Sequence, residues 1–364
     1  MVDIDPCAVG MTRAEPPDPL KMGVQVLDPA EFRGWDQLLR GYSNASFFHS
    51  AAWASVLRDT FGYKSCYFVI SAEDRVRALL PTMQVETMWT ARRGVSLPFT
   101  DRCPLLALNS DFSTELFSQA IEYGRQHQWH YIELRDGSSL QGGAVPSVSY
   151  LEHVIPLCEE SGALARMKSE VRTAIRRAER ERVSVKVDQT LESVRAFYKL
   201  HCRTRRRHGL PPQPFVFFEN IWKHALRHGM GAVFLAAQDD RAVAGAIFLC
   251  FANQAIFKFG ASDETFQQLR GNNLIFWEAI KRFKRQGYST LHLGRTALSD
   301  HGLRRFKLGW GAEEQRLEYC RYDLRTLRFV PSKDRASGWH NALFRRLPVT
   351  VNRMAGALIY RHMG

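Results

Sequence analysis

The sequence predicts an α/β protein, of the α+β type, with two tandem domains in which mixed, mostly antiparallel sheets are flanked by helices. Three observations lead to this prediction. The chain has 364 residues, which is too long for one ordinary hydrophobic core and suits two domains. Hydrophobic residues make up 45% of the chain, enough for each domain to bury a core. The order of helical and strand patterns in the first half also recurs in the second, which indicates an internal duplication.

The first domain is predicted at residues 24–155, after a leader at 1–20 that is expected to be disordered. It begins with a helix at 46–61, in which apolar side chains recur at helical spacing. The residues of that apolar face are Trp53, Val56, Leu57 and Phe61. The elements that follow are a hairpin of strands at 65–71 and 76–87, a strand–loop–strand segment at 94–108, a helix at 112–128, a strand at 130–136 and a loop at 137–149.

The second domain is predicted at residues 161–330 and repeats this order. Its elements are a basic helix at 164–182, a strand at 183–187, helices at 191–209 and 215–229, two strands at 231–253 joined at Asp239–Asp240, a strand at 254–262, a helix at 269–287, a strand at 288–296 and a short helix that ends at Gly309–Gly311. Asp300 is expected to cap that short helix at its N-terminus.

Residues 331–364 are predicted to form a basic, amphipathic helical tail, interrupted at Pro348. Two apolar stripes carry the prediction, the first formed by Trp339, Leu343, Phe344 and Leu347 and the second by Val351, Met354 and Leu358. The tail is interpreted either as helices docked on the domain or as a membrane-surface element, because basic and aromatic residues flank the stripes.

The net charge of +13 favours polyanionic partners, namely nucleic acid, anionic lipid or phosphorylated ligands, although a merely soluble basic surface explains it too. No apolar run reaches the roughly 20 residues that a membrane span needs. The N-terminus lacks the apolar segment of a secretory signal. We therefore expect a cytoplasmic protein, with peripheral contact to the inner membrane as an alternative.

Two classes of chemistry have little support in the sequence. The seven cysteines are widely spaced without a Cys-x-x-Cys pair, so neither a disulfide framework nor a zinc ribbon is expected, and no metal site is predicted. A Gly-x-Ser-x-Gly pattern is also absent, which argues against a covalent serine nucleophile.

The segment after the strand at 254–262 has residues suited to phosphate. Gln268, Arg270, Gly271 and Asn273 lie where a helix is predicted to begin, and the unpaired N–H groups of a helix start attract phosphate. The arginine adds a charged donor, and the glycine permits close approach. An arginine and a glycine before a helix are also common in ordinary folds.

Cations gather around the predicted short helix. Arg295 follows a strand, at the edge where open α/β folds place ligand groups. Arg304 and Lys307 lie three residues apart on the helix, with Phe306 between them. Three cations at one crevice suit an anionic substrate or a developing oxyanion, and a solvated basic helix is the alternative.

Two further basic stretches contain Arg176 and Arg206. In the first, Lys168, Arg172 and Arg176 recur at helical spacing and form one stripe. In the second, arginines cluster at 203–207. Such stripes bind phosphates without sequence specificity, and a plain solvated face is the competing interpretation.

Short motifs in both predicted domains occur together. The first-domain motifs are Phe47–His49 with Trp53, Phe61–Tyr63, Leu80–Pro81 and Ser96–Phe99. The second-domain motifs are the basic helix Arg172–Arg180, Thr204–Gly209 with Pro211–Pro212, Lys258–Asp263, Leu274–Ala279, Gly294–Thr296 and Gly302–Gly311. Together these motifs resemble a known family, the FemAB-related proteins of the GNAT superfamily and their BioF2-like acetyltransferase domain. The resemblance covers roughly residues 40–325.

The resemblance implies two tandem GNAT-like domains and an acyl- or aminoacyl-transferase acting on an amine or hydroxyl of a cell-envelope or polysaccharide precursor. It implies acyl-CoA or aminoacyl-tRNA as the donor, an acceptor linked to a nucleotide or lipid phosphate, and no permanently bound cofactor. By the same resemblance, Lys307 binds or polarises the substrate near the reacting carbonyl, with Arg304 and Arg295 as neighbours.

The reaction expected is direct transfer, in which the enzyme positions two substrates and stabilises the oxyanion. Asp263 and Asp101 are candidates for accepting the proton of the acceptor, because both lie in predicted loops. Either residue could equally be an ordinary turn residue. The rival class is a non-catalytic GNAT-fold protein that binds nucleic acid or anionic lipid.

From the sequence, we predict that Lys307→Ala lowers turnover on the order of 100-fold, as the loss of one oxyanion donor does, while leaving the fold intact. Steady-state kinetics and circular dichroism of the variant measure the two parts. Unchanged turnover would contradict the role given to Lys307.

Overall fold

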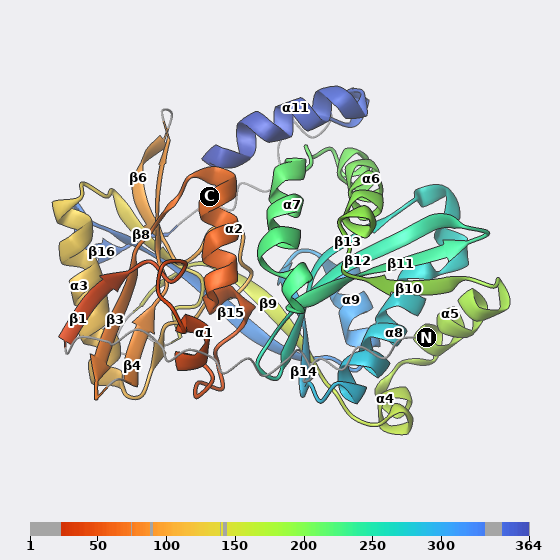
Figure 1. Ribbon diagram of the computed structural model, residues 1–364, viewed down its shortest axis with the longest axis horizontal. Coiled ribbons are helices and arrows are strands. Elements are labelled where there is room, and N and C mark those ends of the chain that lie inside the picture. The colour runs from red at the N-terminus through yellow and green to blue at the C-terminus, as the bar shows by residue number, and fades with distance from the viewer. Residues whose placement is uncertain are drawn as a thin grey trace. The chain divides into compact units, whose positions relative to one another are not determined.

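The computed structural model describes residues 23–363 apart from 74, 88–89, 139, 141–143 and 332–343, and divides into two compact units (Figure 1). The N-terminal unit comprises the described residues of Thr12–Tyr150, Arg316–Ala336 and Ile359–Gly364. The C-terminal unit comprises Leu151–Gln315 and the described residues of Ser337–Leu358. The division falls within two long strands, β9 (Pro146–Pro156) and β15 (Glu313–Asp323). The predicted leader at 1–20, Trp339 and Leu343 lie outside the described residues.

The N-terminal unit contains two ladders of strands with helices beside them. Its elements are β1 (Gly23–Leu27), α1 (Trp35–Leu38), η1 (Phe47–His49), α2 (Ala51–Phe61), β2 (Lys64–Ser65), β3 (Tyr67–Ala72), β4 (Arg75–Leu80), β5 (Met83–Thr87), β6 (Thr90–Val95), β7 (Leu106–Ala107), α3 (Ser110–Gln126), β8 (Tyr131–Leu134) and β16 (Arg328–Phe329). One ladder has the order β1-β3-β4-β7, and the other joins β8, β6, β5 and β2. All of these pairs are antiparallel except β6 and β8.

Helix α2 confirms the apolar face predicted from the sequence. All four residues of that face are buried. The helix begins after Ser50, whose hydroxyl accepts a hydrogen bond from the backbone N–H of Trp53 at 3.3 Å, and this satisfies one donor of the first turn. It ends at Gly62, whose φ of 73° is readily adopted by glycine.

One strand prediction and one loop prediction differ from the structure. The strand expected at 76–87 is two strands in different ladders, because Pro81 lacks the N–H that would continue the pairing of β4. The loop expected at 137–149 ends earlier, where β9 begins at Pro146. Strand β15 was not predicted either, because its sequence EEQRLEYCRYD is highly charged.

The C-terminal unit places helices on both faces of a five-strand ladder. Its elements are α4 (Glu160–Arg166), α5 (Ser169–Arg180), β10 (Ser184–Asp188), α6 (Leu191–Arg207), α7 (Phe215–His224), η2 (Leu226–His228), β11 (Gly231–Gln238), β12 (Arg241–Phe251), β13 (Gln254–Ser262), η3 (Glu264–Leu269), α8 (Gly271–Arg285), β14 (Thr290–Ala297), α9 (His301–Gly309) and α11 (Val349–Ile359). The short helix η4 (Tyr360–His362), which follows α11, belongs to the N-terminal unit. The strand order is β10-β11-β12-β13-β14, antiparallel except for β13 and β14. Together the two units confirm the predicted fold class of mixed, mostly antiparallel sheets flanked by helices.

The two faces of this sheet are covered by α6 and α8. A side chain at Gly245 would meet Phe197 and Leu200 of α6. The residue before it on the strand, Ala244, faces Gly271 of α8 instead. Because side chains alternate along a strand, the two helices lie on opposite faces. The turn between β11 and β12 lies at Asp239–Asp240 as predicted, with φ values of 47° and 62°.

The basic helix expected at 164–182 is instead two helices, α4 and α5. The chain is extended at Met167 and Lys168 between them. Met167 is buried in the core of the unit, and the Lys168 N–H donates to the carbonyl of Gly309 at 2.9 Å. This non-local bond ties the start of α5 to the end of α9, which sequence periodicity does not reveal.

Candidate functional site

Strands β13 and β14 are parallel but pair with each other only at their first residues. The pairing runs from Gln254 to Ile256 on β13 and from Thr290 to His292 on β14. β13 then continues to Ser262 and β14 to Ala297 with no pairing between them. A shift in the β12–β13 register at Lys258 adds a bulge just where the strands part. Backbone groups on the facing edges therefore point into the opening between the strands.

The same unit contains a cavity of about 740 Å³. It is formed by three segments that the sequence marked separately: the basic helix α5, the start of α8 and helix α9. Its lining residues are Lys168, Ser169, Glu170, Val171, Thr173, Ala174, Arg177, Arg270, Asn273, Gly302, Arg305, Phe306 and Gly309. Four of them are cations, and the apolar part is formed by Val171, Ala174 and Phe306. We call this space the α5–α8–α9 cavity.

At the start of α8, the four residues predicted to bind phosphate have different surroundings. Arg270 and Asn273 line the α5–α8–α9 cavity, and exposed Gln268 does not. Arg270 precedes the helix with a φ of 58°, a conformation that an arginine adopts only when the surrounding structure requires it. A side chain at Gly271 would come within 3.2 Å of Ala236 and Val243. The glycine is therefore explained by close packing of α8 on the sheet.

Helix α9 begins as predicted, since the Asp300 carboxylate accepts the N–H of Leu303 at 2.9 Å. Lys307 is 3% exposed, and its Nζ donates to the carbonyls of Gly294 at 2.7 Å and Arg295 at 3.1 Å. Successive carbonyls of an extended strand point in opposite directions. The φ of 70° at Gly294 turns the chain so that both oxygens reach one ammonium group.

These bonds change what is expected of Lys307→Ala. The lysine fixes the end of β14 to α9, so its loss leaves two carbonyls without their charged donor. An unsatisfied buried group costs about 1–3 kcal/mol. The expectation of an intact fold therefore gives way to one of lower stability, and the transition-state role stays a prediction.

A polar network next to Lys307 was not predicted from the sequence. Arg304 donates twice to the Glu314 carboxylate, from Nε and Nη2, each at 2.7 Å. The same carboxylate lies 3.0 Å from Nε2 of His153, a side chain with no exposed surface. Nδ1 of His153 is 3.4 Å from the hydroxyl of Thr296 on β14. The network joins α9 to β9, β14 and β15.

The protonation of His153 follows from its partners. Its pKa is lowered by burial and by the nearby charges of Lys307 and Arg304, against the opposing effect of Glu314. The pKa of Glu314 is lowered chiefly by its hydrogen bonds from Arg304, so the carboxylate only accepts. The neutral imidazole therefore carries its proton on Nε2, and the Thr296 hydroxyl donates to Nδ1.

The two candidate bases lie in different units. In the C-terminal unit, Asp263 caps η3 through Thr265 and contacts Arg203 Nη1 at 2.8 Å. Although burial opposes its ionisation, its pKa is lowered by the Thr265 hydrogen bonds and by the charges of Arg203 and Arg241. A carboxylate with a lowered pKa is a weaker proton acceptor.

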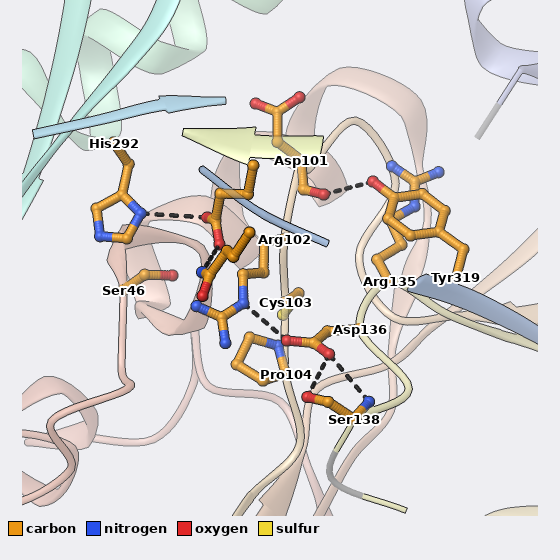
Figure 2. A network of polar contacts seen from close by, with 12 residues as sticks. Ser46, Asp101, Arg102, Cys103, Pro104, Arg135, Asp136, Ser138, His292 and Tyr319 are labelled. Carbon is orange, nitrogen blue, oxygen red and sulfur yellow. Dashed lines mark hydrogen bonds and ion pairs between the residues drawn. The ribbon is translucent and has the colours of Figure 1, made fainter. Parts of the chain in front are cut away.

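Asp101 belongs to the N-terminal unit, where its backbone oxygen accepts the Tyr319 hydroxyl and its carboxylate points away from that ring (Figure 2). Next to it in sequence, Arg102 Nε donates to Asp136 at 2.7 Å, and Asp136 also accepts the hydroxyl of Ser138 at 2.6 Å. This network orders the loop that carries Asp101.

The remaining predicted cations lie outside the α5–α8–α9 cavity. Arg176 is exposed on α5, where the neighbouring Arg177 lines the cavity instead. Arg295 is exposed near the end of β14. Arg206, on α6, lines a second cavity of about 450 Å³.

The described residues also bear on a metal site and on a membrane span. In that part of the chain, no three His, Cys, Asp or Glu side chains gather as metal ligands would. None of the described helices is both long and apolar enough to cross a membrane.

Comparison with known proteins identifies the C-terminal unit. Residues 165–319 match the family described as the acetyltransferase (GNAT) domain. The fold is similar to the crystal structure of FemX, with a TM-score of 0.65 at 14% identity over 82% of this chain and 97% of that chain. It is also similar to a tandem GNAT protein of the clavulanic acid biosynthesis pathway, with a TM-score of 0.53 at 11% identity over 86% of this chain and 100% of that chain.

A third similar structure is the C-terminal domain of a putative lysylphosphatidylglycerol synthetase from Agrobacterium fabrum, with a TM-score of 0.51 at 14% identity over 74% of this chain and 86% of that chain. Among curated protein sequences, none matches the chain.

We predict that Lys307→Met raises the pKa of His153 toward its ordinary value of 6.5, because one of the charges that lower it is removed. In the parent protein, stability should fall as the pH drops below about 6.5, since the unfolded chain takes up the proton first. NMR titration of the His153 ring measures the pKa. Arg305→Met, a change at an exposed cation of the same helix, serves as the control, and an unchanged His153 pKa in Lys307→Met would contradict the coupling.

Proposed function

We propose that this chain, whose residues 165–319 form a GNAT acetyltransferase domain, transfers an acyl group from acyl-CoA to an amine or hydroxyl of a cell-envelope precursor. The observation that carries the proposal is the α5–α8–α9 cavity, which combines cations and an apolar wall in one place. Both suit an acyl thioester of coenzyme A, and the same unit contains the parted strands β13 and β14.

The cations of the cavity suit the phosphates of the donor. Lys168, Arg177, Arg270 and Arg305 come from three different segments. The N-terminus of α8 adds N–H groups and the positive end of a helix dipole. A volume of about 740 Å³ is in the range of small-molecule sites. The apolar wall formed by Val171, Ala174 and Phe306 suits the chain between the phosphates and the thioester.

The transfer itself needs little from the protein besides positioning. The acceptor nitrogen or oxygen attacks the thioester carbonyl, an oxyanion forms, and the carbon–sulfur bond breaks. The departing thiolate takes up the proton that the acceptor loses. Backbone N–H groups where β13 and β14 part are suited to hold the oxyanion. Direct transfer fits a site without a serine nucleophile motif.

The nature of the acceptor is supported by the similar structures. Lysylphosphatidylglycerol synthetase is named for an aminoacylated phospholipid, and an envelope acceptor fits this comparison. Aminoacyl-tRNA is the alternative donor. We propose acyl-CoA as the donor, because the α5–α8–α9 cavity combines cations with an apolar wall.

We predict that Arg177→Ala and Arg270→Ala each weaken acetyl-CoA binding by on the order of ten-fold, because each removes a charged phosphate contact. Isothermal titration calorimetry measures the dissociation constant. Arg180→Ala removes the same charge from an exposed position of α5 and should leave the constant unchanged.

Longer acyl-CoAs and UDP-sugar precursors extend the same measurement. Stabilisation of the protein only by oligonucleotides or anionic vesicles, with no binding of any acyl-CoA, would replace the proposal with the non-catalytic binding protein.

A further inference from the structure

Four arginines line the second cavity, which lies on the other side of the C-terminal sheet from α8. Arg203, Arg206 and Arg207 come from the C-terminal end of α6, and Arg345 comes from the tail. The cavity has a volume of about 450 Å³, and its other lining residues are Ser262, Asp263, Glu264, Thr265 and Val349. We call it the arginine cavity.

The charge of the arginine cavity is only partly balanced by the protein. Asp263 is engaged by Arg203 at 2.8 Å and by Arg241 at 3.6 Å. Nη1 of Arg207 is buried and has no hydrogen-bond partner among the described residues. A buried charged donor left unpaired is costly, and such groups normally have a partner. A phosphate oxygen would supply the missing acceptor, since arginine binds phosphate with matched geometry.

An ordinary surface helix buries its apolar side chains and exposes its polar ones. The neighbouring helix α11 does the opposite. Its docked side has Asn352, whose Nδ2 donates to the Phe344 carbonyl at 2.8 Å, and Gly356. A side chain at Gly356 would lie 1.9 Å from the Pro212 carbonyl, so the helix packs there through its backbone. Its small and polar residues thus face the protein.

The exposed side of α11 carries the apolar residues. Val351, Met354 and Leu358 are 42%, 69% and 69% exposed, and their spacing places them in one stripe. The stripe is flanked by cations, since Arg345, Arg346 and Arg353 are exposed as well. Val349 at the start of the helix and Arg345 just before it also line the arginine cavity. The phosphate-binding and apolar features are therefore adjacent.

We infer that α11 lies on an anionic phospholipid surface, with its apolar stripe in the boundary between headgroups and acyl chains and a lipid phosphate in the arginine cavity. Interfacial helices combine such a stripe with flanking basic residues. A second protein chain would explain the stripe but not the unpaired Arg207. The inference goes beyond the proposed transfer and does not depend on it, because it uses neither the α5–α8–α9 cavity nor the parted strands.

Sedimentation of the full chain with vesicles tests the inference. Vesicles of phosphatidylcholine with added phosphatidylglycerol should bind the protein, and vesicles of phosphatidylcholine alone should bind it much less. Met354→Ser with Leu358→Ser should weaken binding to the anionic vesicles by on the order of 100-fold. Arg206→Gln with Arg207→Gln should weaken it on the order of ten-fold or more. Val216→Ser, at an exposed apolar residue of α7, and Arg180→Gln are the matched controls.

Three outcomes would overturn the inference. The first is no binding of the parent protein to anionic vesicles, and the second is equal binding by the Met354→Ser/Leu358→Ser variant. The third is stabilisation by inorganic phosphate or pyrophosphate that the Arg206→Gln/Arg207→Gln variant loses, without vesicle binding, which would assign the cavity to a soluble ligand. Circular dichroism and thermal unfolding, measured on every variant, show whether the variant is folded. Acetyl-CoA binding, measured in parallel, keeps failure of this inference distinct from failure of the proposed transfer.

Discussion

β13 and β14 hydrogen-bond to each other over three residues and then part, and the rest of the C-terminal unit is arranged around that opening. η3 and α8 follow the end of β13, and α9 follows the end of β14. Buried carbonyls at the end of β14 need hydrogen-bond donors. Lys307 supplies a donor there, because it binds two carbonyls that Gly294 has turned toward it.

The features that the sequence predicted correctly are local ones. The apolar face of α2, the aspartate cap of α9 and the turn at Asp239–Asp240 each depend on residues a few positions apart. β9 and β15 escaped prediction because one begins with proline beside a loop-like segment and the other is highly charged. Both are held by pairing with distant strands. His153 and Glu314 lie on these two strands, so the network beside Lys307 could not be anticipated either.

In the candidate site, too, local sequence predicts some features, and contacts between distant residues decide the others. The stretch from Gln268 to Asn273 was marked by composition, and two of its four residues do line the α5–α8–α9 cavity. The basic composition of the helix at 164–182 also predicts a phosphate site. It points to Arg176, however, whereas the neighbouring Arg177 lines the cavity. Burial of Val171, Ile175 and Ala178 sets which side of α5 meets the core, and that depends on the position of α8. Cations are visible in a sequence, whereas the direction in which they point is a tertiary property.

Hydrogen–deuterium exchange with and without acetyl-CoA tests the central claim most directly, because it reports on backbone groups at the opening and on all three segments of the cavity at once. We predict that acetyl-CoA binding slows exchange in peptides covering residues 168–177, 257–262, 270–276 and 301–309. Protection confined to other parts of the chain, or the same exchange with saturating acetyl-CoA bound, would contradict it.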